Sequence, residues 1–220
     1  MNDAAINAEL DRKVLEIDAG QGAATLRAVH DFLGRFVRYP SKHAQVAHTL
    51  WCAHTHCMDF WYTTPRLAFM SAEKKSGKTR ALEVTEMLTP GAILSFNASP
   101  AALVRKVAQG GCTILYDEID GVFGSAKLEE NNADVRSILN SGYKRGAKAL
   151  RCVTGGGRKV ELEELNAYAP VALAGLKGLP DTLASRSILI RLRRRAPDGS
   201  SGAIPNQTGA ANRGCDLSEA

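Results

Sequence analysis

AEKKSGKT, at residues 72–79, differs at one position from the phosphate-binding loop pattern G-x-x-x-x-G-K-[ST]. Such a loop surrounds phosphate oxygens with backbone N–H groups, and the helix that follows adds the positive end of its dipole. The pattern assigns Lys78 to the terminal phosphates and the Thr79 hydroxyl to magnesium. Ala72 replaces the first glycine, and a turn accepts its methyl group only at negative φ. The residues expected around the nucleotide are Ala72, Lys75, Ser76, Gly77, Lys78, Thr79 and Arg80.

The flanking sequence predicts a strand before this loop and a helix after it, as a phosphate-binding loop requires. Residues 65–71 form a short apolar run that begins with proline. Residues 80–88 carry apolar side chains at helical spacing and are followed by Thr-Pro-Gly. The alternative is a lysine-rich surface loop with a chance Gly-Lys-Thr. The order of the two elements favours the phosphate-binding loop.

A second motif lies about forty residues further on, where residues 112–118 read CTILYDE. An apolar strand that ends in carboxylates is the Walker B pattern, in which Asp117 coordinates magnesium through water. Glu118 is then placed to polarise the water that attacks the γ-phosphate. A strand at residues 93–96 and a helix at 101–109 are expected between the two motifs. Alternatively, Asp117, Glu118 and Asp120 form only a solvated strand end.

Composition limits the class of protein. The chain has 220 residues, of which 45% are hydrophobic, enough for one α/β domain with a real core. The net charge of +5 favours an anionic partner. Five cysteines in no paired framework, no signal peptide and no apolar stretch of membrane length predict a cytoplasmic protein that does not associate with membranes.

The N-terminal region, residues 1–64, is expected to form a helical extension. A helical stripe runs through residues 24–37, and Ser41 is expected to cap a second helix that reaches Met58. Several histidines and cysteines on this second helix raise the possibility of a zinc site, but they lack the paired spacing of zinc ligands. Packing residues on a half-buried helix are the favoured interpretation.

Residues 136–159 contain seven basic residues and no acidic one. Strand-like runs on both sides of a glycine-rich turn predict a β-hairpin at residues 147–162 with a basic tip. A solvated charged face is one interpretation. Contact with a nucleic-acid backbone is the other. The residues expected to make that contact are Lys148, Arg151, Arg158 and Lys159.

Two further apolar runs, at residues 168–176 and 187–192, complete the pattern of buried strands. Strands that are apolar throughout and alternate with helices predict a parallel sheet covered on both faces. The fold class is therefore an α/β P-loop NTPase, with its core at residues 65–195. Residues 196–220 have no periodicity and are expected to form a disordered tail.

Residues 72–79, 116–120, 139–142 and 179–188 together resemble an ATPase domain of phages, prophages and other mobile elements. Members of this largely uncharacterised family are often described as primase–helicase or replication proteins. The resemblance covers about residues 45–195 and extends to AAA+ and superfamily-three helicases, which form rings around DNA. It implies ATP and Mg²⁺ as cofactors, ATP-driven translocation or unwinding, a hexameric ring, and a primase or other replication protein as a partner.

The same resemblance implies roles for two further parts of the chain. The basic hairpin takes the place of a hairpin that touches DNA in the ring's pore. Arg186 resembles the arginine finger that reaches the neighbouring subunit's nucleotide, and a surface arginine that caps a strand is the alternative interpretation. The sequence departs from the family at Ala174 and Gly175, where a polar sensor residue is expected, and has no lid-like pattern after Arg195. A nucleotide-dependent loader or regulator, or an inactive remnant, therefore remains an alternative.

Overall fold

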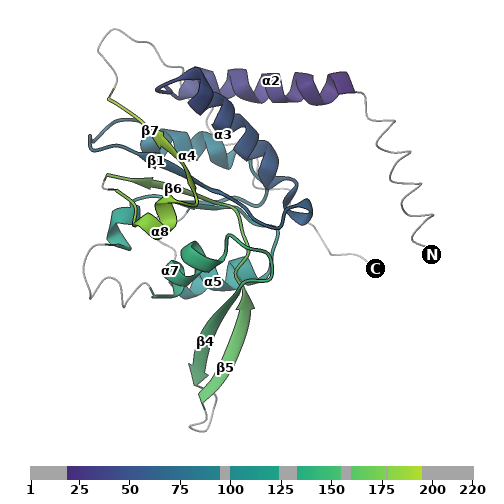
Figure 1. Cartoon of the computed structure of the whole chain (residues 1–220), viewed down its shortest axis with the longest axis vertical. Helices are drawn as coiled ribbons and strands as arrows, with labels where there is room; N and C mark the ends of the chain where they lie inside the picture. The colour runs from purple at the N-terminus through teal and green to yellow at the C-terminus, as the bar shows by residue number, and fades with distance from the viewer. Residues whose placement is uncertain (1–18, 95–99, 124–132, 155–159, 177, 195–220) are drawn as a thin grey trace, which may run out of the picture.

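A five-stranded parallel sheet forms the centre of the structure, a computed structural model that describes residues 19–94, 100–123, 133–154, 160–176 and 178–194 (Figure 1). The strand order is β2-β3-β6-β1-β7, and every neighbouring pair is parallel. The bounds are Arg66–Met70 for β1, Ile93–Leu94 for β2, Ile114–Tyr116 for β3, Val171–Gly175 for β6 and Ser187–Arg191 for β7. The prediction of an α/β fold with a parallel sheet is confirmed, and the arrangement is compatible with a P-loop fold.

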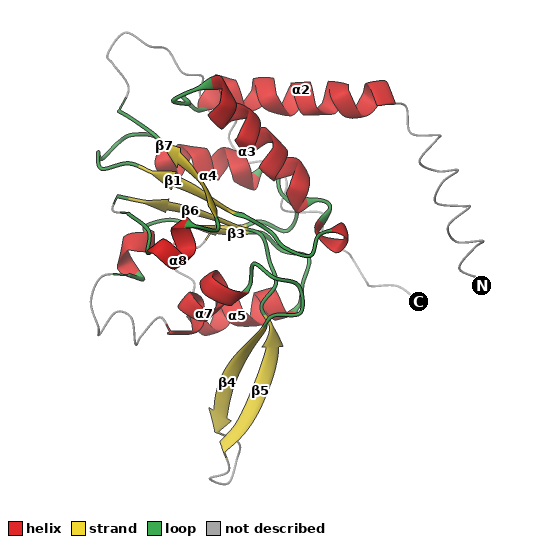
Figure 2. Ribbon diagram, in the orientation of Figure 1, coloured by secondary structure: helices red, strands yellow, loops and turns green. Residues whose placement is uncertain are grey.

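Helices cover both faces of this sheet (Figure 2). One layer consists of α2 (Ala19–Phe36), α3 (Lys42–Thr55) and α4 (Lys78–Glu86). The other consists of α5 (Pro100–Ala108), α7 (Ala133–Ser141) and α8 (Asp181–Ala184). No helix in the described ranges is long and apolar enough to cross a membrane.

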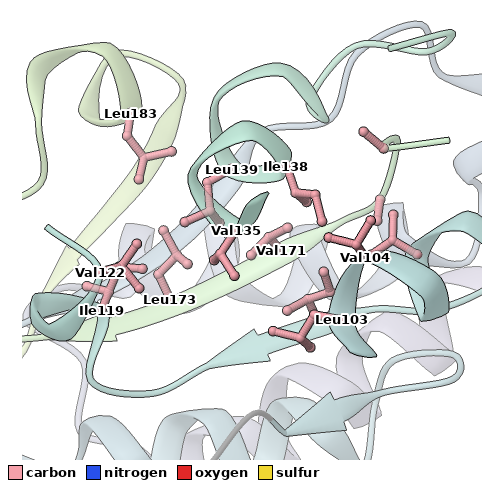
Figure 3. Packing of buried hydrophobic residues seen from close by; sticks show 14 of the residues in the cluster. Leu103, Val104, Ile119, Val122, Val135, Ile138, Leu139, Val171, Leu173 and Leu183 are labelled. Carbon is pink, nitrogen blue, oxygen red and sulfur yellow. The ribbon is translucent and has the colours of Figure 1, made fainter. Parts of the chain in front are cut away.

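Side chains alternate between the two layers along β1, which is buried over its whole length. Leu67 and Phe69 pack with residues of α2, α3 and α4, whereas Ala68 and Met70 pack with residues of α5, α7 and α8. This alternation follows from the two-residue period of a strand. Figure 3 shows the second cluster, in which side chains from α5, α7 and α8 meet those of β6. The central strand is thus fixed from both sides.

A buried arginine anchors the start of β1. The Arg66 side chain is fully buried and donates hydrogen bonds to the carbonyl oxygens of Ile138, Leu139 and Ala169. Burial, and then the nearby charge of Arg186, lower the pKa of the guanidinium to about 9. A cation suits this place because Ile138 and Leu139 lie in the last turn of α7, at the negative end of the helix dipole. The Ile138 carbonyl also accepts a hydrogen bond from the Gly142 N–H at 2.8 Å.

The helix predicted to begin at Ser41 forms, but it is shorter than expected. The Ser41 hydroxyl accepts a hydrogen bond from the Ala44 N–H at 3.2 Å, as an N-cap does. The helix ends at Thr55 rather than continuing to Met58, and a short 3-10 turn, η1 (Met58–Phe60), follows. The extension of the helix to Met58 was wrong because the chain tightens to i→i+3 bonds at Cys57 and Phe60. The proposed domain division stays a prediction, and its tail, residues 196–220, lies outside the described ranges.

A two-stranded antiparallel hairpin projects away from the sheet (Figure 2). It consists of β4 (Lys148–Thr154) and β5 (Val160–Asn166), with Lys148 opposite Asn166 at its base. The predicted hairpin is therefore confirmed, and its second strand is longer than expected. The turn at residues 155–159 lies outside the described ranges.

Candidate functional site

The predicted phosphate-binding loop joins β1 to the first residue of α4, Lys78. Gly77 has φ 89°, a left-handed conformation that side chains rarely adopt, so the backbone itself accounts for glycine there. Among the described residues other than glycine, positive φ occurs at Lys75 and Glu118. Ala72 is not one of them, so its methyl group is compatible with the turn.

Lys78 lies across this loop. Its ammonium group donates to the carbonyl oxygen of Glu73 at 3.1 Å and to the Ser76 hydroxyl at 3.2 Å. The first N–H groups of a helix have no intrahelical acceptors, so the start of α4 adds donors and the positive dipole end at the same place. Backbone donors and a lysine around one loop suit a bound polyphosphate.

The two motifs meet at one point. The Thr79 hydroxyl donates to a carboxylate oxygen of Asp117 at 2.8 Å, although the residues are 38 positions apart. They meet because β1 and β3 run parallel on either side of β6, so the loop after each strand emerges at the same edge of the sheet. A hydroxyl and a carboxylate are oxygen ligands of the kind that Mg²⁺ prefers.

The donor set at this point is suited to a magnesium ion that shares its coordination with other groups. In the described part of the chain, no group of three or more His, Cys, Asp or Glu side chains could hold a metal ion. Mg²⁺ commonly binds one or two carboxylates together with waters and substrate phosphates. The residues present therefore fit Mg²⁺ bound together with a phosphate compound.

Glu118 follows Asp117 in an unusual backbone conformation. Its φ of 56° and ψ of 47° are left-handed, and its N–H donates to the Asp117 carboxylate at 2.9 Å. A non-glycine residue in this region costs roughly 1–2 kcal/mol. Such strain often marks a functional position. The Glu118 side chain is exposed at the same edge of the sheet as Thr79.

Asp120, which was not among the predicted site residues, connects this region to β6. Its carboxylate accepts a hydrogen bond from the Leu176 N–H at 2.6 Å. The preceding residue, Gly175, ends β6. The strand ends of β3 and β6 are thus joined through a side chain of the β3 loop.

A hollow of about 270 Å³ adjoins the loop. It is lined by residues 34–38 at the end of α2, by loop residues 75–77, by Arg80, and by Leu192 and Arg193 after β7. Arg35, Arg38 and Arg193 were not predicted for the site, because they come from segments far apart in the sequence. The one local signal was the basic run at residues 191–195. The backbone N–H of Arg194 also donates to the Glu73 carboxylate at 3.0 Å.

Arg186 is not brought to this site within the same chain. It precedes β7 and so lies at the opposite edge of the sheet from the loop. Its guanidinium donates to the Asn140 carbonyl at 2.6 Å and stacks over the Tyr143 ring, 4.4 Å from the centroid. Its role as an arginine finger for a neighbouring subunit stays a prediction.

The predicted nucleic-acid residues are described only in part. Lys148 is exposed at the base of the hairpin. The backbone of Arg151 lies on β4, but the structure does not describe its side chain. Arg158 and Lys159 lie outside the described ranges. Their contact with DNA therefore stays a prediction.

Three of the histidine and cysteine side chains of α3, those of His48, Cys52 and His54, take part in packing. His48 and Cys52 are buried, and the His48 ring lies within hydrogen-bond distance of Tyr39 and Thr85. His54 contacts the Thr64 hydroxyl at 3.0 Å and stacks on Trp61. Burial lowers the pKa of both histidines, to about 3 for His48.

Among the solved structures to which this chain is distantly similar is a viral helicase. The chain is similar to the JCV (JC virus) helicase, in a crystal structure with N-(4-(2-(thiazolo[5,4-c]pyridin-2-yl)phenoxy)phenyl)acetamide bound, at 13% sequence identity and a TM-score of 0.38. The match covers 69% of this chain and 41% of the helicase chain, so this chain spans about two fifths of that protein's length. No family model and no curated protein matches the sequence.

Proposed function

We propose that this protein binds ATP with Mg²⁺, hydrolyses it, and uses the hydrolysis to move on or unwind DNA. The observation that carries the first part is the 2.8 Å contact between the Thr79 hydroxyl and the Asp117 carboxylate. A lysine-rich surface loop has no reason to place its threonine against a carboxylate at the end of another buried strand. A magnesium–phosphate site requires that placement.

Each residue at the loop has a distinct task in this proposal. Lys78 exchanges its contacts with Glu73 and Ser76 for the terminal phosphates. Thr79 and Asp117 hold the magnesium ion, which neutralises negative charge on the phosphates when bound. Glu118 orients the attacking water and accepts its proton. The basic hollow beside the loop receives the remainder of the nucleotide.

The DNA part rests on charge and on position. The chain carries a net charge of +5, and Lys148 is exposed where the hairpin leaves the domain. Arg186 lies at the edge of the sheet opposite its own loop. It can therefore assist hydrolysis only at another subunit, which is the reason to propose a ring, with six subunits as the family resemblance implies.

A second function is favoured by the contacts of Arg186. Its guanidinium is held by the Asn140 carbonyl and the Tyr143 ring of its own chain. If these contacts persist in an assembly, hydrolysis is slow, and the protein acts as a nucleotide-dependent loader or regulator through a replication partner such as a primase. Tight ATP binding with negligible turnover would favour this second function over the first.

ATP turnover measured with and without single-stranded or forked DNA tests the main proposal. We expect Lys78→Ala to abolish turnover, and Glu118→Gln to reduce it roughly 100-fold or more while ATP remains bound. Lys74→Ala is the matched control, because Lys74 is an exposed lysine of the same loop with no proposed task. Turnover in Lys78→Ala equal to that of the wild type would contradict the ATPase proposal. Turnover that does not respond to DNA would contradict the helicase part alone.

A further inference from the structure

Three consecutive aromatic residues are exposed just before β1. Phe60, Trp61 and Tyr62 have 80%, 44% and 64% of their surface accessible to solvent. Several exposed apolar side chains next to one another often mark an interaction site, whereas single exposed apolar residues are common on protein surfaces. We refer to these three residues as the aromatic run.

The backbone of the aromatic run is held firmly. The Trp61 carbonyl accepts hydrogen bonds from the Arg145 guanidinium at 3.1 Å and from the Tyr168 hydroxyl at 2.8 Å. The Tyr62 carbonyl accepts from the Arg145 N–H at 2.8 Å, and the next residue, Thr63, forms a β-bridge with Lys144. The run is therefore fixed before any partner arrives, which lowers the entropic cost of binding.

Exposed cations border the same surface. The Lys144 ammonium lies over the Tyr62 ring, 5.3 Å from its centroid, and Arg145 stacks over Tyr168. Lys144, Arg145 and Lys148 are all exposed, and Asp59 is the acidic residue nearest in sequence. Aromatic faces beside lysine and arginine match a ligand that combines flat rings with negative charge.

The aromatic run also lies at the base of the hairpin. Arg145 and Lys144, which contact it, precede β4 by a few residues, and Tyr168 follows β5 by two. A hollow of about 320 Å³ opens beside it, between η1 and the hairpin base, and includes Asp59, Asn166 and Tyr168 in its lining. An extended polymer bound along the hairpin would therefore reach the aromatic run at the hairpin's base.

From these observations we infer that the aromatic run and its bordering cations form a platform for single-stranded nucleic acid. Bases stack on the rings of Phe60, Trp61 and Tyr62, while Lys144 and Arg145 contact the phosphates, so binding depends little on base sequence. This inference rests on the proposed function only in that the protein acts on a nucleic acid. The bordering cations favour this ligand over an apolar protein segment, which would leave their charges without a counterpart.

Binding of a fluorescein-labelled oligo(dT), measured by anisotropy without ATP, tests the platform. We expect Phe60→Ala and Tyr62→Ala each to weaken binding about 5- to 150-fold. Leu50→Ala, which removes another exposed apolar side chain from α3, is the control and should bind as the wild type does. An oligonucleotide of equal length with abasic sites should bind the wild type weakly and be little affected by the two substitutions.

Tryptophan fluorescence gives a second measurement. Trp51 is 1% exposed and its indole N–H donates to the Pro65 carbonyl, so the ligand-sensitive signal belongs to Trp61. We expect oligo(dT) to quench wild-type fluorescence and to have little effect in Trp61→Phe. Unfolding measurements should show that all the variants remain folded.

Three results would overturn the platform. The first is equal binding of the abasic and intact oligonucleotides, which would reduce the contact to phosphates alone. The second is unchanged oligo(dT) affinity in Phe60→Ala and Tyr62→Ala. The third is a change in subunit assembly in these variants without a change in DNA affinity, which would assign the run to a protein interface.

ATP turnover, measured in parallel, separates the two proposals. Turnover that is stimulated by DNA equally in the wild type and in Phe60→Ala would overturn the platform and leave the proposed function in place. A protein that binds the intact oligonucleotide more tightly than the abasic one, but hydrolyses no ATP, would support the platform and contradict the proposed function.

Discussion

His48 illustrates how a single side chain can be matched to its surroundings. Its ring is fully buried, with Nδ1 2.7 Å from the Tyr39 hydroxyl and Nε2 2.9 Å from the Thr85 hydroxyl. Since the Thr85 hydroxyl donates to the Ala81 carbonyl, it accepts from Nε2–H, and Tyr39 then donates to Nδ1. Both hydrogen bonds of the His48 ring therefore require the neutral form of the imidazole. Burial lowers the pKa of His48 to about 3.

This arrangement predicts acid sensitivity. Between pH 6.5 and about 3 the unfolded chain protonates His48 and the folded chain does not, so the folded protein binds fewer protons. Above pH 6.5 His48 is neutral in both states, so it does not lower the free energy of unfolding there. The free energy of unfolding falls by up to about 1.4 kcal/mol per pH unit as the pH decreases through that window.

Urea unfolding at a series of pH values measures this slope. We expect His48→Gln to reduce this pH dependence of the free energy of unfolding, by up to about 1.4 kcal/mol per pH unit between pH 6.5 and about 3. Parallel slopes for the wild type and His48→Gln would show that His48 does not titrate differently in the folded state.

At the scale of elements, the helices before residue 64 are integral to the packing of the sheet. Leu33 of α2 is fully buried in the same cluster as Leu67 of β1 and Leu82 of α4. Phe36 and Val37 belong to the same cluster, and residues 34–38 also line the hollow beside the loop. The end of α2 therefore contributes both to the core and to the candidate site.

We expect Leu33→Ala to lower the free energy of unfolding by about 2–5 kcal/mol, the usual cost of a cavity in a packed core. Leu26→Ala on the same helix should cost about 1 kcal/mol or less, because Leu26 is 36% exposed. Denaturant unfolding of the two variants provides the comparison. Equal, small losses would mean that α2 is only loosely attached.

The elements themselves were largely predictable from the sequence, whereas their ends and meeting points were not. Apolar runs located β1, β3, β6 and β7, and the glycine-rich turn located the hairpin. The end of α3 was missed because a change from α to 3-10 bonding leaves no clear mark in apolar spacing. The hollow was missed because Arg35, Arg38 and Arg193 meet only through tertiary folding. Exposure of the aromatic run was missed because aromatic side chains are usually buried.

At the scale of the whole molecule, the candidate site joins segments from four parts of the chain. The loop after β1, the end of α2 and the segment after β7 border one hollow, and Asp117 adds a fourth contact from β3. A ligand bound here links segments that otherwise separate on unfolding. Nucleotide binding should therefore stabilise the fold as a unit.

Thermal unfolding with Mg²⁺ and increasing ATP checks this expectation. At an ATP concentration about 100 times Kd, the stabilisation is about 2.7 kcal/mol. For a chain of this size that corresponds to a rise in Tm of roughly 5–10 °C. We expect the rise in the wild type and in Lys74→Ala but not in Lys78→Ala. An equal rise in all three proteins would place the nucleotide away from the predicted loop.

Gly175 limits the order in which this protein can acquire new substitutions. A Cβ atom at this position would lie 2.7 Å from the Ile119 side chain, 3.1 Å from Met70 and 3.2 Å from the Asp120 carboxylate. The contact with Ile119 is closer than a Cβ atom tolerates, so a side chain at the end of β6 requires Ile119 to shift, and a smaller residue at position 119 removes the clash. The Asp120 carboxylate, which accepts a hydrogen bond from the Leu176 N–H, would also have to move by a few tenths of an ångström. Descendants of this sequence that gain a side chain here should carry the change at Ile119 as the older mutation.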